Sequence, residues 1–394
     1  MVLASTFFAS INVGADTAAK QALDQQLSRV PVDIVVRPSY GFTPGIPEER
    51  TLGVLSSDNA TELVNIISNS GIEGITHTEA ISRGSRMIQL PDANKTSYFY
   101  FTGISENSSV YDGLTVTNGA PSLGVNETYV WVDSPEASDL KLGDVLPVNV
   151  SVWLGDGYEE KWLTVNLTVA GFVELDDKAS LIALGQYYYY PDPLGTSEEY
   201  VPEMNLLIAD WDKTFARLLD AVYAMAPRYS PIDTHILVFL DREMLIGPWS
   251  IDTSLGKVRT ITYQINNEVS SWGAYAENHL ENVLNSYQFV SQTMRFQFLI
   301  VALPVFFMAW YMGTTVSDVS LNLRRREIGL LSTKGFSRGQ LLRMFLSEAA
   351  LIGLIGGLIG IGLSLLLNPF FVTATGGRWF SGAPVIGTET AILV

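Results

Sequence analysis

Two long apolar runs dominate the hydrophobic pattern of the chain. Residues 296–317 and residues 349–367 contain no charged side chain. An α-helix rises about 1.5 Å per residue, so a helix of roughly 20 residues crosses the hydrocarbon layer of a bilayer. Buried core helices of a soluble protein are the alternative, but such helices rarely stay uncharged and apolar for so long. We therefore predict two transmembrane helices, over 296–317 and 349–367.

The segment between the two runs is basic. Its charged residues from Leu321 onward are the cations Arg324, Arg325, Arg326, Lys334, Arg338 and Arg343 and the acids Glu327 and Glu348. Short loops rich in Lys and Arg stay on the cytoplasmic side of a membrane. The connection is therefore predicted to be cytoplasmic. The long region before residue 295 then lies outside the cell membrane, in a multi-pass protein.

The region before the first run mixes short strand and helix patterns. Segments such as 32–36 and 97–104 are rich in β-branched and aromatic residues, whereas 61–69 has the apolar spacing of a helix. Such interleaving is typical of an α+β domain. From Ile261 to Met294 apolar residues recur every three or four positions, and this stripe predicts one continuous stalk helix that leads into the first apolar run.

These patterns divide the chain into seven parts. We expect the truncated end of a first transmembrane helix (1–14), an extracytoplasmic α+β domain (15–260), a stalk helix (261–295), a transmembrane helix (296–317), a cytoplasmic coupling hairpin (318–348), a second transmembrane helix (349–367), and an extracytoplasmic loop with the start of a further transmembrane helix (368–394). The predicted fold class is a membrane protein with transmembrane α-helices and a large α+β extracytoplasmic domain on a helical stalk.

Charge narrows the classes of function. Residues 1–294 hold 16 basic and 37 acidic side chains, and residues 295–394 hold 8 and 4. An acidic domain is a poor partner for nucleic acid, which needs clustered cations. There is no Cys, and the three His lie far apart in the sequence, so we expect no metal site and no cofactor in this chain.

Six glycosylation sequons agree with the outside assignment. All lie before residue 295, at Asn59, Asn94, Asn107, Asn126, Asn149 and Asn166. The N-x-Ser/Thr pattern marks possible acceptors and shows no modification by itself.

The cytoplasmic segment has the signals of a helical hairpin. Gly335 suits the position just past a helix end, where a left-handed backbone is favoured. Ser337 followed by Gln340 predicts a capping box that starts a new helix. The hairpin therefore turns over Gly335 and Phe336.

The second apolar run has a face of small residues. Gly353 with Gly357, and Gly356 with Gly360, are spaced four apart. Such pairs let another transmembrane helix approach closely, so they predict a packed bundle or a dimer. A dinucleotide-binding loop is the competing interpretation, but no strand precedes this run and no acidic partner follows it.

At the hairpin the chain resembles the FtsX-like/MacB-like permease family of ABC transporters. The resemblance rests on residues 324–331 (RRREIGLL), residues 334–337 (KGFS), Gln340-Leu341-Leu342, Phe345, Glu348 and the glycine-rich run. It implies four transmembrane helices, with the first mostly missing here and the fourth absent or beyond Val394. It also implies a cytoplasmic ABC ATPase as partner, a second permease subunit in a homo- or heterodimer, and ATP bound by the ATPase alone. The residues expected to contact that ATPase are Arg325, Glu327, Lys334, Gly335, Phe336, Ser337 and Arg338.

The function implied is mechanotransmission. ATP hydrolysis in a separate ATPase would move the hairpin, and the stalk would pass the movement to the extracytoplasmic domain, for export or extraction of a substrate that the sequence does not identify. The chain itself is expected to be non-catalytic. One alternative is a membrane-anchored receptor or adhesion protein without ATPase coupling. Another is an extracellular hydrolase, for which the scarcity of His makes a Ser-His or metal site hard to assemble.

Overall fold

The computed structural model describes residues 20, 23–24, 26–38, 55–91, 95–154, 159–187, 204–225, 231–247 and 250–374. The chain forms two compact units. One is Gln26–Asn285, called here the sheet domain, and the other combines Met1–Gln25 with Ser286–Val394. Each unit is described by itself.

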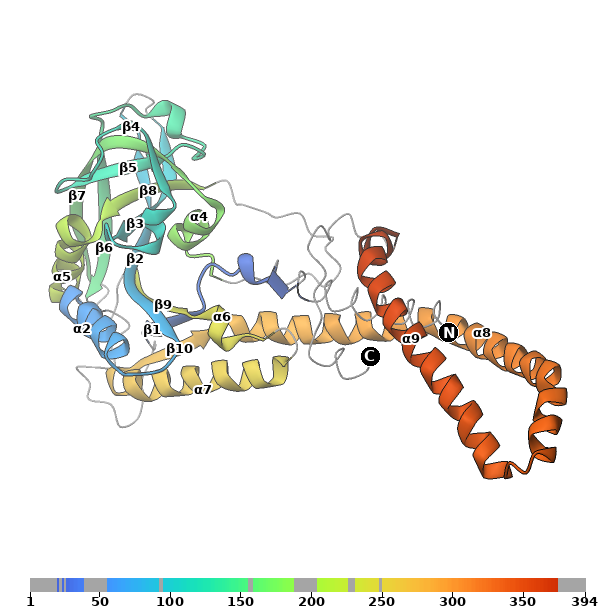
Figure 1. The fold of residues 1–394 in the computed structure, drawn as a ribbon. Helices are drawn as coiled ribbons and strands as arrows, with labels where there is room; N and C mark the ends of the chain where they lie inside the picture. The colour runs from blue at the N-terminus through green and yellow to red at the C-terminus, as the bar shows by residue number, and fades with distance from the viewer. Residues whose placement is uncertain are drawn as a thin grey trace. The chain divides into compact units, whose positions relative to one another are not determined.

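Ten strands of the described residues form one sheet in the sheet domain (Figure 1). They are β1 (Ile34–Pro38), β2 (Ile75–Gln89), β3 (Thr96–Ile104), β4 (Leu114–Gly119), β5 (Glu127–Trp131), β6 (Val145–Leu154), β7 (Glu159–Leu175), β8 (Asn205–Asp210), β9 (Ile232–Leu240) and β10 (Ala274–Asn278). The order is β10-β1-β9-β2-β3-β8-β5-β7-β4, and β6 pairs with β7.

Most neighbouring strands are antiparallel, but β3 pairs in parallel with β8, and β5 in parallel with β7. Strands distant in sequence therefore lie next to each other, as β9 does between β1 and β2. The hairpin of β6 and β7 keeps its register to Leu154 opposite Glu159, and its turn lies outside the described residues. The predicted α+β domain is confirmed.

Several helices accompany the sheet. In the sheet domain they are α2 (Ser57–Ser68), α3 (Ser109–Asp112), α4 (Asp177–Leu184), α5 (Ala216–Met225), α6 (Arg242–Leu245) and α7 (Ile251–Val269), with single turns at Ala137–Asp139, Trp211–Phe215 and Ser270–Trp272. Local signals set α4: the Asp176 carboxylate accepts a hydrogen bond from the amide of Ala179, and Gly185 ends the helix at φ +69°. Its buried Ile182 packs in one apolar cluster with Leu206 of β8 and Leu237 of β9.

The predicted continuous stalk helix over 261–295 is wrong. Helix α7 ends at Val269, and after one turn Gly273 adopts φ +66°. The chain then forms β10, which pairs antiparallel with β1, before α8 begins at His279. The left-handed backbone at Gly273 cannot continue a helix, and β1 offers an unpaired edge that residues 274–278 occupy.

Helix α7 covers the outer edge of β10. The side-chain oxygen of Asn266 accepts a hydrogen bond from the amide of Ala276 at 2.7 Å, and Asn278 donates to the Thr262 hydroxyl at 2.9 Å. Unpaired strand edges attract other chains, so these side chains protect the end of the sheet. The apolar stripe predicted from the sequence therefore belongs to two helices, α7 and α8, which are separated by the strand β10.

Two long helices, α8 (His279–Thr333) and α9 (Arg338–Ala374), follow the sheet domain's last strand in the chain (Figure 1). The predicted span 296–317 lies inside α8, which continues through Pro304. The predicted span 349–367 lies inside α9. In the part of the chain that the structure describes, one segment, Gly339–Gly356, is long and apolar enough to cross a membrane by length and composition. The number of spans stays a prediction.

Candidate coupling hairpin

The end of α8 is closed by its backbone. The amide of Phe336 donates to the carbonyl of Leu331 at 3.3 Å, and the amide of Lys334 donates to the carbonyl of Leu330 at 3.2 Å. Between them Gly335 adopts φ +91°. A six-to-one hydrogen bond over a left-handed glycine is the Schellman motif, which satisfies carbonyls that a helix end leaves open. The predicted role of Gly335 in ending the helix is confirmed.

The start of α9 is closed by a reciprocal pair of hydrogen bonds. The side-chain carbonyl of Gln340 accepts from the amide of Ser337 at 3.0 Å, and the Ser337 hydroxyl accepts from the amide of Gln340 at 3.3 Å. The predicted capping box is confirmed. Both helix ends at the turn are therefore closed by hydrogen bonds.

An ion pair joins the two legs of the hairpin. The Arg324 guanidinium donates to the Glu348 carboxylate at 2.7 Å, and both side chains are about two-fifths exposed. Sequence reasoning counted Arg324 among the basic residues and missed this role. The signal was faint, because 24 positions separate the partners and only the fold brings them together.

The predicted contact residues divide into two groups. Arg325, Lys334 and Ser337 are exposed, and the Phe336 side chain is 44% exposed. The side chains of Glu327 and Arg338 lie outside the described residues. An exposed aromatic ring near the exposed Lys334 at a helical turn is suited to a protein partner, because aromatic side chains supply much of the binding energy at interfaces.

The glycine face is described in part. Gly356 is buried, and Gly353 is half-buried with nothing within 4 Å of the position that a Cβ would occupy. The surroundings of Gly357 and Gly360 lie outside the described residues. The open space at Gly353 is compatible with the close approach of another helix, which remains a prediction.

The sequons are placed mostly at the surface. Asn107, Asn126, Asn149 and Asn166 are exposed, and Asn59 is half-buried in α2. Asn94 lies outside the described residues. Exposure permits modification at four sites and decides nothing about its occurrence.

A buried aromatic and cationic cluster in the sheet domain escaped sequence reasoning. The Tyr187 ring is 1% exposed, and the rings of His235 and His279 lie 5.7 and 6.3 Å from it, centroid to centroid. The guanidinium carbons of Arg37 and Arg83 are each 5.9 Å from the same centroid. These residues come from five separate elements or loops, so no sequence motif identifies the cluster. Within the described residues, no group of three metal-ligating side chains occurs.

Burial sets the charge of this cluster. Burial, together with the nearby Arg37 and Arg83, lowers the pKa of His235 to about 3. Burial also lowers the pKa of His279 to about 4 and raises the pKa of Tyr187 to about 12. Both imidazoles are therefore neutral at pH 7. Arg37 pairs with the Glu277 carboxylate at 3.2 Å and Arg83 donates to the carbonyl of Leu184 at 2.7 Å, and both guanidinium groups also lie over the Tyr187 ring.

Comparisons with known proteins find similarity to ABC transporter permeases. Residues 298–388 match the family model described as FtsX-like permease C-terminal. The chain is 47% identical over 53 residues to "Macrolide export ATP-binding/permease protein MacB" of Neisseria gonorrhoeae, covering 14% of this chain and 8% of that protein. It is 51% identical over 45 residues to "Uncharacterized ABC transporter permease YknZ" of Bacillus subtilis, covering 11% of each. The matches thus span about a tenth of the length of these relatives.

The solved structures that match include the extracellular domain of the noncanonic ABC-type transporter YknZ from Gram-positive bacteria. It matches with a TM-score of 0.31 at 8% identity, over 62% of this chain and 99% of that one.

Proposed function

We propose that this chain, which belongs to the FtsX-like ABC transporter permeases, is a permease subunit of the mechanotransmission type. Its residues 298–388 match the C-terminal domain of that family. A separate cytoplasmic ATPase binds and hydrolyses ATP, and the permease itself is non-catalytic. The ATPase moves the hairpin, and α8 carries the movement to the sheet domain outside the membrane. The work done there is export or extraction of a substrate.

The observation that carries this proposal is the construction of the hairpin. A Schellman turn, a capping box and the Arg324–Glu348 ion pair fix its shape, and Phe336 and Lys334 are left exposed at its tip. A rigid tip transmits force from a docked partner better than a flexible loop does. A simple membrane anchor has no need for such a tip.

Helix α8 supports transmission by its continuity. Its first turns are fixed in the sheet domain, where Leu280, Val283 and Leu284 are fully buried and the amide of His279 donates to the carbonyl of Asp33 at 2.9 Å. The same helix runs unbroken to Thr333, next to the hairpin turn. An unbroken helix passes on a tilt or a shift that a flexible linker would absorb.

The membrane arrangement is part of the proposal. The spans at 296–317 and 349–367 are the second and third of four, and the sheet domain is extracytoplasmic in a multi-pass membrane protein. The glycine face with Gly353 and Gly356 contacts a second permease subunit. The relative MacB is named as an ATP-binding/permease protein, and we propose that here the ATP-binding part is a separate chain.

Charge reversal at the hairpin tests the coupling. We expect Arg325→Glu with Arg338→Glu to reduce the stimulation of the co-expressed ATPase by about tenfold or more, because like charges facing each other at an interface cost several kcal/mol. The measurement is ATP hydrolysis by the complex reconstituted in lipid, compared with the ATPase alone.

The matched control is Arg217→Glu with Lys161→Glu, an equal charge change at exposed positions of α5 and β7. It should leave both co-purification and stimulation unchanged. If the double hairpin variant co-purifies with the ATPase and stimulates it normally, the docking assignment is wrong, and a receptor or adhesion protein without ATPase coupling becomes the better interpretation.

A further inference from the structure

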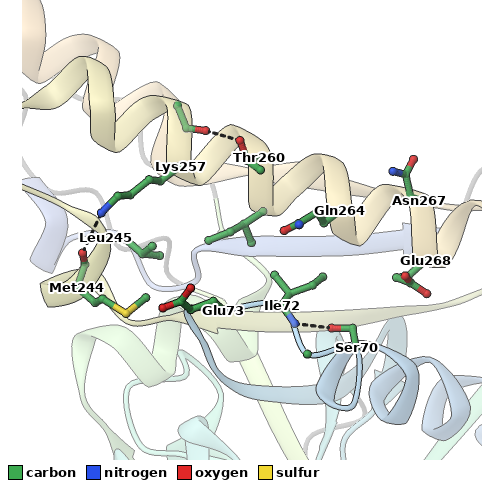
Figure 2. A pocket seen from close by; sticks show the side chains of 13 residues that line it. Ser70, Ile72, Glu73, Met244, Leu245, Lys257, Thr260, Gln264, Asn267 and Glu268 are labelled. Carbon is green, nitrogen blue, oxygen red and sulfur yellow. Dashed lines mark hydrogen bonds between the residues drawn. The ribbon is translucent and has the colours of Figure 1, made fainter.

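A groove of about 750 Å³ lies along α7 in the sheet domain (Figure 2). One wall is the face of α7 from Gly256 to Glu268. The other wall combines the turn after α2, residues 70–73, with Met244 and Leu245 of α6. Its volume lies in the range of ordinary ligand sites, and the groove is unrelated to the coupling hairpin.

The α7 wall is a row of polar side chains. The members of the row are Lys257, Thr260, Gln264, Asn267 and Glu268, all labelled along α7 in Figure 2. Their spacing of three and four residues places them on one face of the helix. From the first to the last the helix rises about 16 Å at 1.5 Å per residue.

The opposite wall is largely apolar. Ile72 is half-buried, Met244 is 43% exposed and Leu245 is buried beneath them. Among them stands the exposed carboxylate of Glu73 (Figure 2). A ligand in the groove would therefore meet hydrogen-bonding groups on one side and apolar surface on the other.

The polar groups of the groove are largely uncommitted. In the ranges that the structure describes, the side chains of Gln264, Asn267, Glu73 and Glu268 form no hydrogen bond or ion pair with another residue. Lys257 donates to the carbonyl of Met244 at 3.5 Å. Two carboxylates without a cation and two amides without a partner are available to a ligand.

We propose that this groove binds an extended peptide segment that carries a basic side chain. About five residues of extended chain, at 3.3 Å each, match the 16 Å length of the polar row. The amides of Gln264 and Asn267 can each donate to and accept from a peptide backbone. Glu73 and Glu268 complement a Lys or Arg side chain, and Met244 covers an apolar neighbour.

This inference goes beyond coupling to the ATPase and is tested without one. The probe is acetyl-Ala-Val-Lys-Val-Ala-amide with a fluorescent label, titrated against the purified full chain in detergent and followed by anisotropy. We expect binding with a Kd below about 1 mM, the weak range of short open contacts. The Glu73→Gln/Glu268→Gln double variant should bind at least tenfold more weakly.

Three comparisons make the result decisive. Glu62→Gln, an exposed carboxylate of α2 outside the groove, should bind like the unmodified chain. The same probe with Glu in place of Lys should bind at least tenfold more weakly. The proposal is overturned if the two probes bind equally, if the double variant binds the peptide as tightly as the unmodified chain, or if no binding occurs at 5 mM probe. It is also overturned if lysine amide binds as tightly as the peptide, because the site would then be one for a small organic cation.

Discussion

The buried histidines around Tyr187 make the stability of the sheet domain depend on pH. In the unfolded chain a histidine has a pKa near 6.5, whereas burial lowers the pKa of His235 to about 3 and that of His279 to about 4. Below pH 6.5 these two imidazoles therefore bind protons in the unfolded chain but not in the folded domain. Stability falls as the pH drops toward 4, by at most about 1.4 kcal/mol per pH unit for each histidine.

Replacing one histidine tests this sign. His235→Gln removes one titrating group while keeping a polar side chain of similar size. We expect the slope of unfolding free energy between pH 6 and pH 5 to fall to about half of its original value. Urea unfolding of the full chain in detergent, followed by tryptophan fluorescence, gives that slope. A slope that is unchanged would show that His235 is not buried in its neutral form.

A second residue pair anchors β1. The Asp33 carboxylate is 2% exposed, accepts from the amide of Leu240 at 2.7 Å and pairs with Arg242 at 2.8 Å. The same guanidinium donates to the carbonyls of Leu27 and Val30. Burial raises the pKa of Asp33, and Arg242 opposes that rise.

Removing the cation should therefore be costly. Arg242→Met leaves a buried carboxylate without its partner, and we expect a loss of about 3 kcal/mol or more in unfolding free energy at pH 7. Adding Asp33→Asn should recover part of that loss, because the uncompensated charge is then gone. Chemical denaturation measures both variants. A loss below about 1 kcal/mol for Arg242→Met would show that water already solvates this carboxylate.

At the scale of elements, local sequence signals were enough to predict the hairpin. Gly335, Ser337 and Gln340 act within a few residues of one another, so the turn and both helix ends could be predicted from the sequence. The interleaved strand and helix patterns likewise predicted an α+β domain. Such features depend on backbone preference and capping, which the sequence displays directly.

Pairings over long distances were not predictable in the same way. β10 exists because residues 274–278 meet β1, some 240 positions earlier in the chain. Trp272, Ala276 and Leu280 happen to keep the spacing of a helix, so periodicity alone favoured one stalk. The Arg324–Glu348 ion pair and the cluster around Tyr187 were likewise not predictable, because each brings together residues that are distant in the sequence.

Two glycines of the hairpin provide a matched test of the turn. A Cβ would meet nothing within 4 Å at either Gly335 or Gly339, but only Gly335 has a positive φ. Gly335→Ala should cost about 1 kcal/mol through backbone strain, whereas Gly339→Ala inside α9 should be neutral or stabilising by up to about 1 kcal/mol. Hydrogen exchange of the amides near the turn reports the difference. Equal exchange in the two variants would contradict the Schellman description.

At the scale of the whole molecule, α8 has residues in both units. If it transmits movement, a flexible break in it should separate ATP hydrolysis from the work done outside the membrane. Replacing Asn285-Ser286 by Gly-Gly is expected to keep ATPase stimulation, since the hairpin is untouched, and to abolish transport in cells. Transport that persists would assign transmission to another part of the protein.

The central proposal is that the hairpin tip contacts an ATPase, and cysteine crosslinking tests it most directly. The chain has no Cys, so Phe336→Cys introduces a single reactive thiol at the tip, and Tyr263→Cys introduces one at an exposed position of α7. Each variant is co-expressed with the ATPase and treated with a short crosslinker that joins a thiol to an amine. We expect a permease–ATPase adduct from Phe336→Cys and none from Tyr263→Cys; no adduct at 336, or equal adducts from both, would contradict the proposal.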